Sequence, residues 1–307
     1  MTAITTETVA VLGAGGTMGF PIARNIARAG MPVRAWNRTR SRAEPLAEDG
    51  AYLADSPADA VRGAGIVITM VSDEDAVIGT MNGPDGALSV MSGETVQAGN
   101  PNGRAHPIWL QMSTIGEAAT ARCAELANRA GVGFVDAPVL GTREPAEQRK
   151  LVVLESGPED ARPRVQPVFD AIGHRTIRVG EAGAGSRLKL VINSWVVAVV
   201  EVGAETIALA EGMGVDPELF FRALDGGSLD LPYLRMKGKA MIEGNFTPLF
   251  RLALAAKDGS LVHASAEAHG LDLPVLEVIA QRLAEGAKEH PNLDFSATYL
   301  TSTPTKR

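Results

Sequence analysis

The chain has 307 residues, of which 45% are hydrophobic and 21% charged, the composition of a folded protein long enough for two domains. With 29 Lys and Arg residues against 36 Asp and Glu residues, its net charge is −7, which argues against nonspecific binding to nucleic acid or to an anionic membrane. Cys123 is the single cysteine, so an intrachain disulfide is excluded and a reducing compartment is expected.

The sequence shows no targeting segment and no evident membrane span. Met1 to Val9 has neither the basic nor the apolar part of a signal peptide. The most apolar run, Leu190 to Val200, is too short to cross a bilayer. We therefore expect a soluble, cytoplasmic protein with no membrane partner and no nucleic-acid partner.

A glycine-rich turn follows the first predicted strand, Val9 to Leu12. A strand, a glycine turn and then a helical pattern are typical of a dinucleotide site, because the backbone can approach the pyrophosphate and the helix N-terminus supplies amides. The spacing of Gly13, Gly15 and Gly19 is one residue longer than GxGxxG, and a purely structural turn is the alternative. The residues of the turn that we expect to bind the cofactor are Gly13, Ala14, Gly15, Gly16, Thr17 and Met18.

The second predicted strand, Pro32 to Trp36, ends in the sequence Asn37-Arg38-Thr39. A domain selective for NAD usually has an acidic residue here, which binds the ribose 2′-hydroxyl. Asn37 is uncharged, and Arg38 can pair with a 2′-phosphate or stack on the adenine; a solvated basic residue is the alternative. We therefore predict that Asn37, Arg38 and Thr39 bind the cofactor and that NADP(H) is preferred over NAD(H).

Short strands and helices then alternate, as in the βαβ units of a parallel sheet. The next predicted elements are strands at Ala51 to Leu53, Gly65 to Val71 and Trp109 to Met112, and helices at Pro57 to Arg62 and Asp73 to Thr80. Ligands bind at the carboxyl ends of such strands, so we expect Val71, Ser72 and Thr114 to contact the cofactor.

A polar segment, Gln97 to Pro107, interrupts this alternation and is predicted to be an inserted surface loop. His106 within it is interpreted as a solvated residue rather than a catalytic one. A strand at Gly133 to Val139 then leads into residues 140–142, again at the ligand-binding edge of the sheet. The last strands of this half are predicted at Leu151 to Leu154 and Thr176 to Val179.

From Ser186 onward the apolar spacing is that of helices. The predicted helices are Ser186 to Met213, Pro217 to Leu224, Leu231 to Glu243, Phe250 to His269 and Pro274 to Glu289, with a frayed tail from Thr301 to Arg307. The expected fold is therefore a Rossmann-type, doubly wound α/β domain over residues 1–181 and an all-α domain over residues 182–307, joined by a long interdomain helix.

The junction between the two halves carries the residues of greatest chemical interest. Gly183 and Gly185 permit a sharp turn, and Ser186 is placed to cap the long helix. Lys189 and Asn193 follow at i and i+4, on one face of that helix, in an apolar setting. A lysine there must find a partner, extend to water or lose its charge, and a structural lysine that extends to water is the alternative to a catalytic one.

Five ordered motifs run nearly from end to end of the chain. They are the Gly13–Gly19 turn, Ser113-Thr-Ile115, Asp136-Ala-Pro-Val139, Gly183–Asn193, and Phe246-Thr-Pro-Leu-Phe250 leading to Lys257-Asp258. In this order they resemble the β-hydroxyacid dehydrogenase family, which includes 3-hydroxyisobutyrate dehydrogenases, tartronate semialdehyde reductases and glyoxylate/succinic semialdehyde reductases. Pro145-Ala-Glu147 is similar to the semialdehyde reductase branch.

The resemblance implies a role for each residue that matches a family motif. Lys189 would be the general acid/base, and Asn193 would orient the substrate. The residues placed on the substrate side are Thr114, Phe250 and Asp258, with Lys257 beside the cofactor and no residue assigned to a metal. A helix-face ion pair is the alternative for Asp258 and Lys257, and a core position is the alternative for Phe250.

The loop after Val139 departs from the family pattern. Leu140 stands where the family has a serine, followed by two glycines, in a loop that binds the substrate carboxylate. Gly141 and Thr142 still offer backbone amides and a hydroxyl, whereas the lost donor costs about 1–3 kcal/mol if its partner stays buried. We expect Leu140, Gly141 and Thr142 to bind the substrate, which leaves room for a less polar carbonyl.

Two other classes of function stay open. Imine reductases share the architecture and NADPH but usually have Asp or Tyr at the position of Lys189, and a non-catalytic family member would lack the lysine. Lys189 counts against both, whereas Leu140 favours a non-carboxylate substrate. The apolar length of the Ser186 helix exceeds the need of one small domain, so a homodimer or a dimer-based oligomer is expected.

Overall fold

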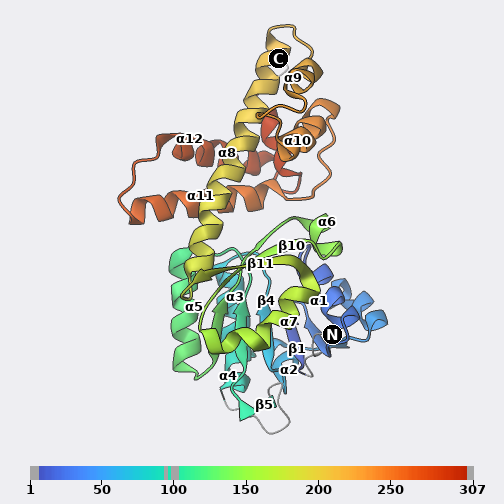
Figure 1. Ribbon diagram of the computed structural model, residues 1–307, viewed down its shortest axis with the longest axis vertical. Helices are drawn as coiled ribbons and strands as arrows, with labels where there is room; N and C mark the ends of the chain where they lie inside the picture. The colour runs from blue at the N-terminus through green and yellow to red at the C-terminus, as the bar shows by residue number, and fades with distance from the viewer. Residues whose placement is uncertain (1–6, 93–95, 98–103, 303–307) are drawn as a thin grey trace. The chain divides into compact units, whose positions relative to one another are not determined.

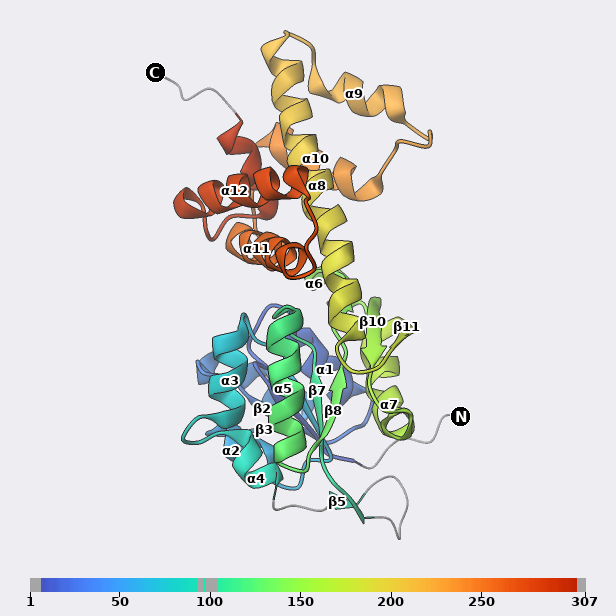
Figure 2. The same ribbon diagram turned by 90° about the vertical axis from the view of Figure 1, so that its left-hand side faces the viewer.

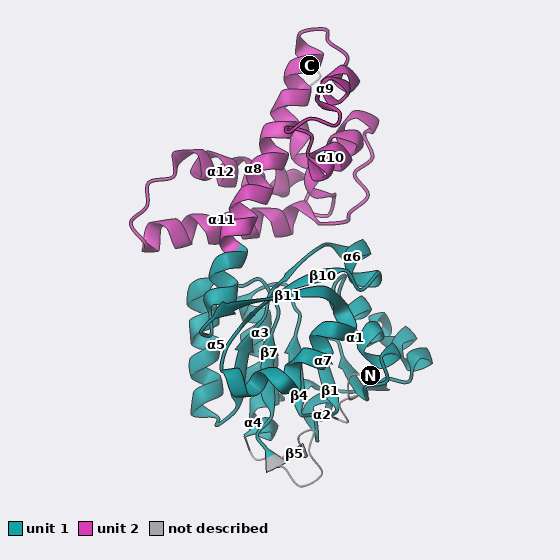
Figure 3. Ribbon diagram, in the orientation of Figure 1, with its two compact units in different colours: residues 1–189 teal, residues 190–307 magenta. Residues whose placement is uncertain are grey.

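The computed structural model describes residues 7–92, 96–97 and 104–302 (Figure 1). The chain divides into two compact units, Met1–Lys189 and Leu190–Arg307, which Figure 3 colours separately. The first unit is an α/β structure and the second consists of helices, as predicted. The sequence places the boundary between residues 181 and 182, and that boundary stays a prediction.

The first unit is built on a sheet with the strand order β11-β10-β8-β7-β4-β1-β2-β3, and β9 pairs with β10. The strands are β1 (Val9–Leu12), β2 (Val33–Trp36), β3 (Tyr52–Leu53), β4 (Ile66–Thr69), β7 (Ile108–Gln111), β8 (Gly133–Asp136), β9 (Val139–Leu140), β10 (Leu151–Ser156) and β11 (Gly173–Gly180). In this sheet order, all neighbouring strands between β8 and β3 pair in parallel. The chain fills one side of β1 with β2 and β3 and then crosses to β4 on the other side, so β1 and β4 flank the switch point where such sheets bind ligands.

Helices cover both faces of this sheet (Figures 1 and 2). Successive residues of β1 face opposite sides: Val11 belongs to the core that contains Ile22 and Phe169, and Leu12 belongs to the core that contains Cys123. This confirms the doubly wound fold. The helices of the unit are α1 (Gly19–Arg28), α2 (Pro57–Val61), α3 (Glu74–Asn82), α4 (Ala87–Met91), α5 (Glu117–Arg129), α6 (Arg143–Glu147) and α7 (Arg162–Ile172).

The cysteine of the chain lies inside this unit. Cys123 is on α5, is fully buried and is a free thiol. Burial raises the pKa of this thiol to about 12, because the thiolate would lose its hydration.

The prediction of one continuous strand from Gly133 to Val139 is wrong in its second half. Strand β8 ends at Asp136, and after Pro138 the chain forms β9, which runs antiparallel to β10. Proline has no N–H to donate to a ladder, so a continuous central strand through Pro138 is disfavoured. The break places Val139 and Leu140 beside β10, in the same sheet.

The second unit contains α8 to α12 and a final 3-10 segment, and the five helices predicted for it are confirmed. The elements are α8 (Ala184–Gly212), α9 (Pro217–Leu224), α10 (Pro232–Glu243), α11 (Leu252–Ala268), α12 (Pro274–Glu289) and η4 (Phe295–Thr301). Helix α8 begins in the first unit and continues into the second. Its residues Val197, Val200 and Ile207 form a core with Leu283 and Phe295.

Helix α8 is long and apolar enough to cross a membrane by length and composition alone. The apolar run from Leu190 to Val200 is too short to span a bilayer, but it is only part of this helix, which has 29 residues. Of its most apolar stretch, 44% is buried within the chain. One such helix is weak support for a membrane span, because the core helix of a soluble protein has the same properties.

Part of the predicted loop at 97–107 lies outside the described residues. Its two ends form a short antiparallel pair, β5 (Val96–Gln97) with β6 (Arg104–Ala105). His106 is exposed, and its carbonyl accepts a hydrogen bond from Arg164 Nη1 at 2.8 Å. The N-terminal residues 1–6 and the tail residues 303–307 are also outside the described part of the chain.

Candidate active site

The glycine turn lies between the carboxyl ends of β1 and β4. Gly13 has a φ of +96°, and a Cβ at this position would lie 2.3 Å from Met70 O. Gly19 opens α1, and a Cβ there would lie 2.2 Å from Gly13 O. The first and last glycines are therefore required for the tight turn and for close packing of the helix, so the longer spacing preserves both functions of the usual motif.

The end of β2 holds this turn in place. The amides of Gly13 and Ala14 both donate to Trp36 O at 2.9 Å. The Gly15 amide donates to Asn37 Oδ1 at 3.1 Å, and Asn37 Nδ2 donates to Thr39 O at 2.8 Å. Asn37 thus uses its side-chain amide to order the turn, which the sequence did not reveal.

The ends of β4 and β7 are joined by a buried serine. Ser113 Oγ accepts a hydrogen bond from the Val71 amide at 2.9 Å and lies 3.2 Å from Thr69 O, to which it donates. Val71 and Thr114 are half-buried and Ser72 is exposed. The predicted cofactor residues after these two strands therefore lie along the same edge of the sheet as the glycine turn.

The residues at this edge fit a dinucleotide. A Cβ at Gly15 would lie 2.7 Å from Asn37 Cγ, so only glycine allows the turn to approach the end of β2 this closely. The first turn of α1 has no acidic residue that would repel a phosphate. Arg38 is exposed at the neighbouring strand end. The turn would hold the pyrophosphate, and Arg38 would lie at the adenosine end.

Lys189 is held at the loop that the sequence assigned to the substrate. Its Nζ donates to Val139 O at 2.8 Å, and the side chain is half-buried. Val139 directly precedes Leu140, Gly141 and Thr142. Gly141 has a φ of +126°, and a Cβ there would lie 2.7 Å from Leu151 Cδ2, so this loop needs its glycine. The structure thus brings Lys189 to the predicted substrate loop.

The start of α8 differs from the prediction. The helix begins at Ala184, so Ser186 lies within its first turn and is not the capping residue. The Ser186 amide donates to Asp136 Oδ2 at 2.8 Å and its hydroxyl donates to Asp136 Oδ1 at 2.7 Å. The carboxylate that accepts from this helix end comes from β8, a long-range contact that local spacing does not reveal.

In the second unit, Asn193 and Asp258 form a buried pair. Asn193 Nδ2 donates to Asp258 Oδ2 at 2.9 Å, and the two residues are 5% and 6% exposed. Lys257 Nζ lies 3.0 Å from Asp258 Oδ1, so the ion-pair alternative for these two residues is present as well. The structure therefore connects three predicted site residues: Asn193, Asp258 and Lys257.

Phe250 lies at the end of a clamped loop. Its ring packs edge-on against Phe295, with the centroids 5.9 Å apart, and it is half-buried. The amides of Leu249 and Phe250 donate to Asp294 Oδ2 at 2.9 and 3.1 Å. Phe250 thus contributes to the core of the second unit, and a contact with substrate stays a prediction.

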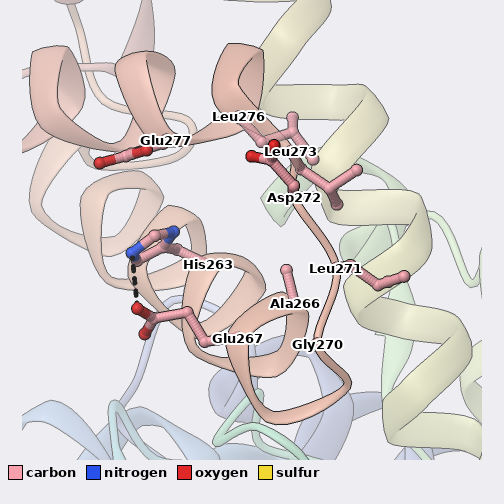
Figure 4. Close-up of a pocket in the computed structure, with 9 residues that line it drawn as sticks. All are labelled: His263, Ala266, Glu267, Gly270, Leu271, Asp272, Leu273, Leu276 and Glu277. Carbon is pink, nitrogen blue, oxygen red and sulfur yellow. Dashed lines mark ion pairs between the residues drawn. The ribbon is translucent and has the colours of Figure 1, made fainter.

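A cavity of about 470 Å³ lies at the turn between α11 and α12 (Figure 4). It is lined by His263, Ala266, Glu267, Gly270, Leu271, Asp272, Leu273, Leu276 and Glu277. On the wall of this cavity, His263 Nε2 and Glu267 Oε1 lie 3.7 Å apart, one turn from each other on α11. None of the predicted site residues lines this cavity, so it is distinct from the candidate site.

Two family models account for nearly the whole chain. The model of the NAD-binding domain of 6-phosphogluconate dehydrogenase matches residues 8–180. The model of the NAD-binding region of NADP-dependent 3-hydroxyisobutyrate dehydrogenase matches residues 183–301.

The chain belongs to the β-hydroxyacid dehydrogenase family. It is therefore an NAD(P)-dependent oxidoreductase that acts on CH–OH groups.

Named relatives of this β-hydroxyacid dehydrogenase are similar over most of their length. The 2-hydroxy-3-oxopropionate reductase of Escherichia coli is 31% identical over 84% of this chain and 84% of its own. Glyoxylate/succinic semialdehyde reductase 2 of Arabidopsis thaliana is 29% identical over 92% of this chain and 76% of its own. The solved 3-hydroxyisobutyrate dehydrogenase of Mycobacterium tuberculosis with L-serine aligns with a TM-score of 0.82 at 27% identity, over 96% of this chain and 99% of that one.

Proposed function

We propose that the enzyme interconverts a small β-hydroxy acid, or a related hydroxy compound, and its aldehyde or ketone, with NADP(H) as cofactor and Lys189 as general acid/base. The observation that carries this proposal is the position of the amine. Lys189 Nζ is hydrogen-bonded to Val139 O at 2.8 Å, immediately before the loop of Leu140, Gly141 and Thr142. A proton donor at this loop is where reduction of a bound carbonyl needs one.

The chemistry assigns separate tasks to the cofactor and the lysine. When bound, a nicotinamide supplies the hydride that reaches the carbonyl carbon. Lys189 in its ammonium form donates a proton to the carbonyl oxygen, and as the neutral amine it accepts that proton in the reverse direction. The hydrogen bond to Val139 O supports this role, because it orients the amine without neutralising its charge.

We assign orientation of the substrate to Asn193. Because Asn193 Nδ2 donates to Asp258, the amide oxygen of Asn193 can serve as the acceptor for a substrate hydroxyl. In this assignment Asp258 acts through Asn193. Gly141 and Thr142 supply donors for a polar group of the substrate, and Leu140 adds apolar contact in place of the family serine.

The preference for NADP(H) rests on the end of β2. No acidic residue stands there, and Asn37 is occupied with the glycine turn. Within residues 7–92, 96–97 and 104–302, Arg38 has no side-chain hydrogen bond or ion pair. An exposed guanidinium at this position suits a 2′-phosphate, with which it forms charge-assisted hydrogen bonds.

Steady-state assays over a panel of aldehydes, 2-oxo acids and cyclic imines, each with NADPH, test the reaction class. Turnover of an aldehyde or keto acid supports the proposal. Turnover of cyclic imines alone would favour an imine reductase, for which Leu140 is the supporting feature. No turnover of any compound, with normal cofactor binding, would favour a non-catalytic family member.

Replacing the lysine tests its role directly. Lys189→Ala is expected to lower kcat by about 10²–10⁴-fold on the best substrate of the panel, because it removes the proton donor. The affinity for NADPH should hardly change. Asn193→Ala should lower kcat less, since an orienting hydrogen bond contributes less than the proton itself.

Arg187→Ala is the matched control for this experiment. Arg187 is a basic residue on the same first turns of α8, but it is exposed and its Nη1 lies 3.6 Å from Glu117. Its loss should leave kcat unchanged. Near-normal turnover of Lys189→Ala would show that the lysine is structural and that this mechanism is wrong.

The composition of the chain also bears on the location and the partners of the enzyme. We infer a cytoplasmic enzyme whose partner is a small carbonyl or hydroxy-acid substrate, with no nucleic acid and no membrane bound. The net charge of −7 supports this, because phosphate-rich surfaces repel an acidic protein. Fractionation of cells in which the natural protein is tagged would check its location.

A further inference from the structure

A fully buried carboxylate lies at the start of the helix that carries Lys189. Asp136 ends β8 and is 0% exposed. Its Oδ1 accepts from Ser186 Oγ at 2.7 Å, and its Oδ2 accepts from the Ser186 amide at 2.8 Å and from Ser156 Oγ at 3.1 Å. Burial of a carboxylate costs several kcal/mol unless it is hydrogen-bonded, so these donors must stay in place for Asp136 to stay inside.

Further contacts connect this cluster to its neighbours. Ser156 Oγ accepts from the Gly185 amide at 2.9 Å, and Thr120 Oγ1 lies 3.1 Å from Ser186 Oγ. A Cβ at Gly185 would lie 2.4 Å from Leu154 O and 3.2 Å from Asp136 Oδ2. Strands β8 and β10 and helix α5 are thereby joined to the first turn of α8, at a spacing that only glycine permits.

The same short segment also holds the lysine side chain. Val139, three residues after Asp136, accepts from Lys189 Nζ at 2.8 Å, and Lys189 is three residues after Ser186. Residues three apart lie on the same side of a helix. The segment from Asp136 to Val139 therefore fixes α8 twice, at its backbone through the carboxylate and at its amine through the carbonyl.

We infer that Asp136 is a positioning residue for proton transfer by Lys189, because its carboxylate sets the axial position and rotation of the first turn of α8. The amine is thereby held beside residues 140–142. This inference rests on the proposed function of Lys189 as the proton donor. Asp136, Ser156 and Ser186 are not among the functional residues predicted from the sequence.

Asp136→Ala tests the inference together with a conservative variant. Without the carboxylate the helix end shifts, and a misplacement of about 1 Å can lower turnover by about 10²-fold. We expect kcat to fall by about that factor, with the dissociation constant of NADPH unchanged. Asp136→Asn should restore most of kcat, because its amide oxygen can accept from the Ser186 amide while its Nδ2 donates to Ser186 Oγ.

A double-mutant cycle separates positioning from general damage. If Asp136 acts through Lys189, adding Asp136→Ala to Lys189→Ala should leave the residual kcat nearly unchanged. If the two losses multiply instead, Asp136 acts independently and the inference is overturned. Normal turnover of Lys189→Ala alone would overturn the proposed function, so the two failures are distinguishable.

Two further variants complete the design. Glu7→Gln changes a carboxylate that is 3% exposed and ion-paired with Arg164, so it should lower stability without changing kcat. Ser186→Ala removes the hydroxyl donor and keeps the backbone donor, and it replaces Asp136→Ala in the cycle if that variant does not fold. An unchanged kcat in folded Asp136→Ala, or in Ser186→Ala in its place, would also overturn the inference.

Discussion

At the end of β2, two neighbouring arginines have different surroundings. Arg40 Nη1 lies 2.5 Å from Asp55 Oδ1 and is occupied by that ion pair. Arg38 is exposed, and no described residue forms an ion pair with it. A 2′-phosphate would therefore meet Arg38 without competition from a carboxylate.

Arg38→Ala should weaken binding of NADPH by about one to two orders of magnitude, since a hydrogen bond to a charged group contributes about 1.5–3 kcal/mol. Binding of NADH should hardly change, because it has no 2′-phosphate. Arg40→Ala is the control and should leave both dissociation constants as they are. Fluorescence titration with each cofactor measures them, and equal affinity of the wild type for NADPH and NADH would refute the preference.

Some residues of the candidate site can be predicted from the sequence, and others cannot. Lys189 and Asn193 were identified because helical periodicity and a family motif coincide at them. The bond of Asn37 to Gly15 and the contact of Asp136 with Ser186 span 22 and 50 residues. No local pattern encodes such pairings, which depend on how the strands are ordered in the sheet.

Among the elements of the second unit, α10, η4 and the loop before α11 meet at one buried ion pair. Lys237 Nζ lies 2.7 Å from Asp294 Oδ1, and the side chains are 2% and 4% exposed. Asp294 also accepts from the amides of Leu249, Phe250 and Ser296. One carboxylate thus joins all three segments.

Lys237→Met should destabilise the second unit by about 3–5 kcal/mol, because it leaves a buried carboxylate without its counter-charge. Lys239→Met is the control on the same helix. Lys239 is 69% exposed and 3.7 Å from Glu243, and such surface pairs contribute about 0–1 kcal/mol. Urea unfolding of the three proteins gives the comparison, and equal midpoints for the two variants would contradict the prediction.

The same pair sets a response to acid. Burial raises the pKa of the Asp294 carboxyl, but the charge of Lys237 and the hydrogen bonds from Lys237, Ser296 and Phe250 lower it further than burial raises it, to below the ordinary 3.8. The resulting stabilisation is complete above that ordinary value and is lost as the pH falls through the lowered pKa. In Lys237→Met the loss should begin at a higher pH, which unfolding curves between neutral and acid pH would show.

Element boundaries were predicted best where the local signal is strong. Helices α9 and α12 begin at Pro217 and Pro274, as predicted, because proline is favoured at the first helical position. Strand β9 was missed, since two residues pairing with β10 have no periodicity of their own. Helix α6 was missed too, since five residues are too few for a helical pattern.

At the scale of the whole molecule, α8 presents an apolar stripe to solvent. Val191, Trp195, Val202 and Leu209 are 65%, 62%, 54% and 62% exposed. Their spacings of four and seven residues place them along one side of the helix. Exposed apolar surface that is continuous in this way marks an interface, and we predict a homodimer formed through it.

Light scattering at micromolar concentration should give twice the chain mass of 32.1 kDa. Trp195→Glu should shift the mass towards the monomer, because it places a charge in the apolar stripe. Trp195→Phe keeps an aromatic ring there and should remain dimeric. A monomeric wild type at this concentration would disprove the prediction.

The reactivity of Cys123 towards a thiol reagent can report on opening of the first unit. The chain has one thiol; it belongs to α5 of the first unit, and it is fully buried with a pKa raised to about 12. A thiol reagent therefore reacts only when the nucleotide domain opens, and the helical unit contributes no signal. The rate of labelling under native conditions thus measures the opening of one domain in the intact protein, and its slowing by NADPH would measure how strongly the cofactor holds that domain closed.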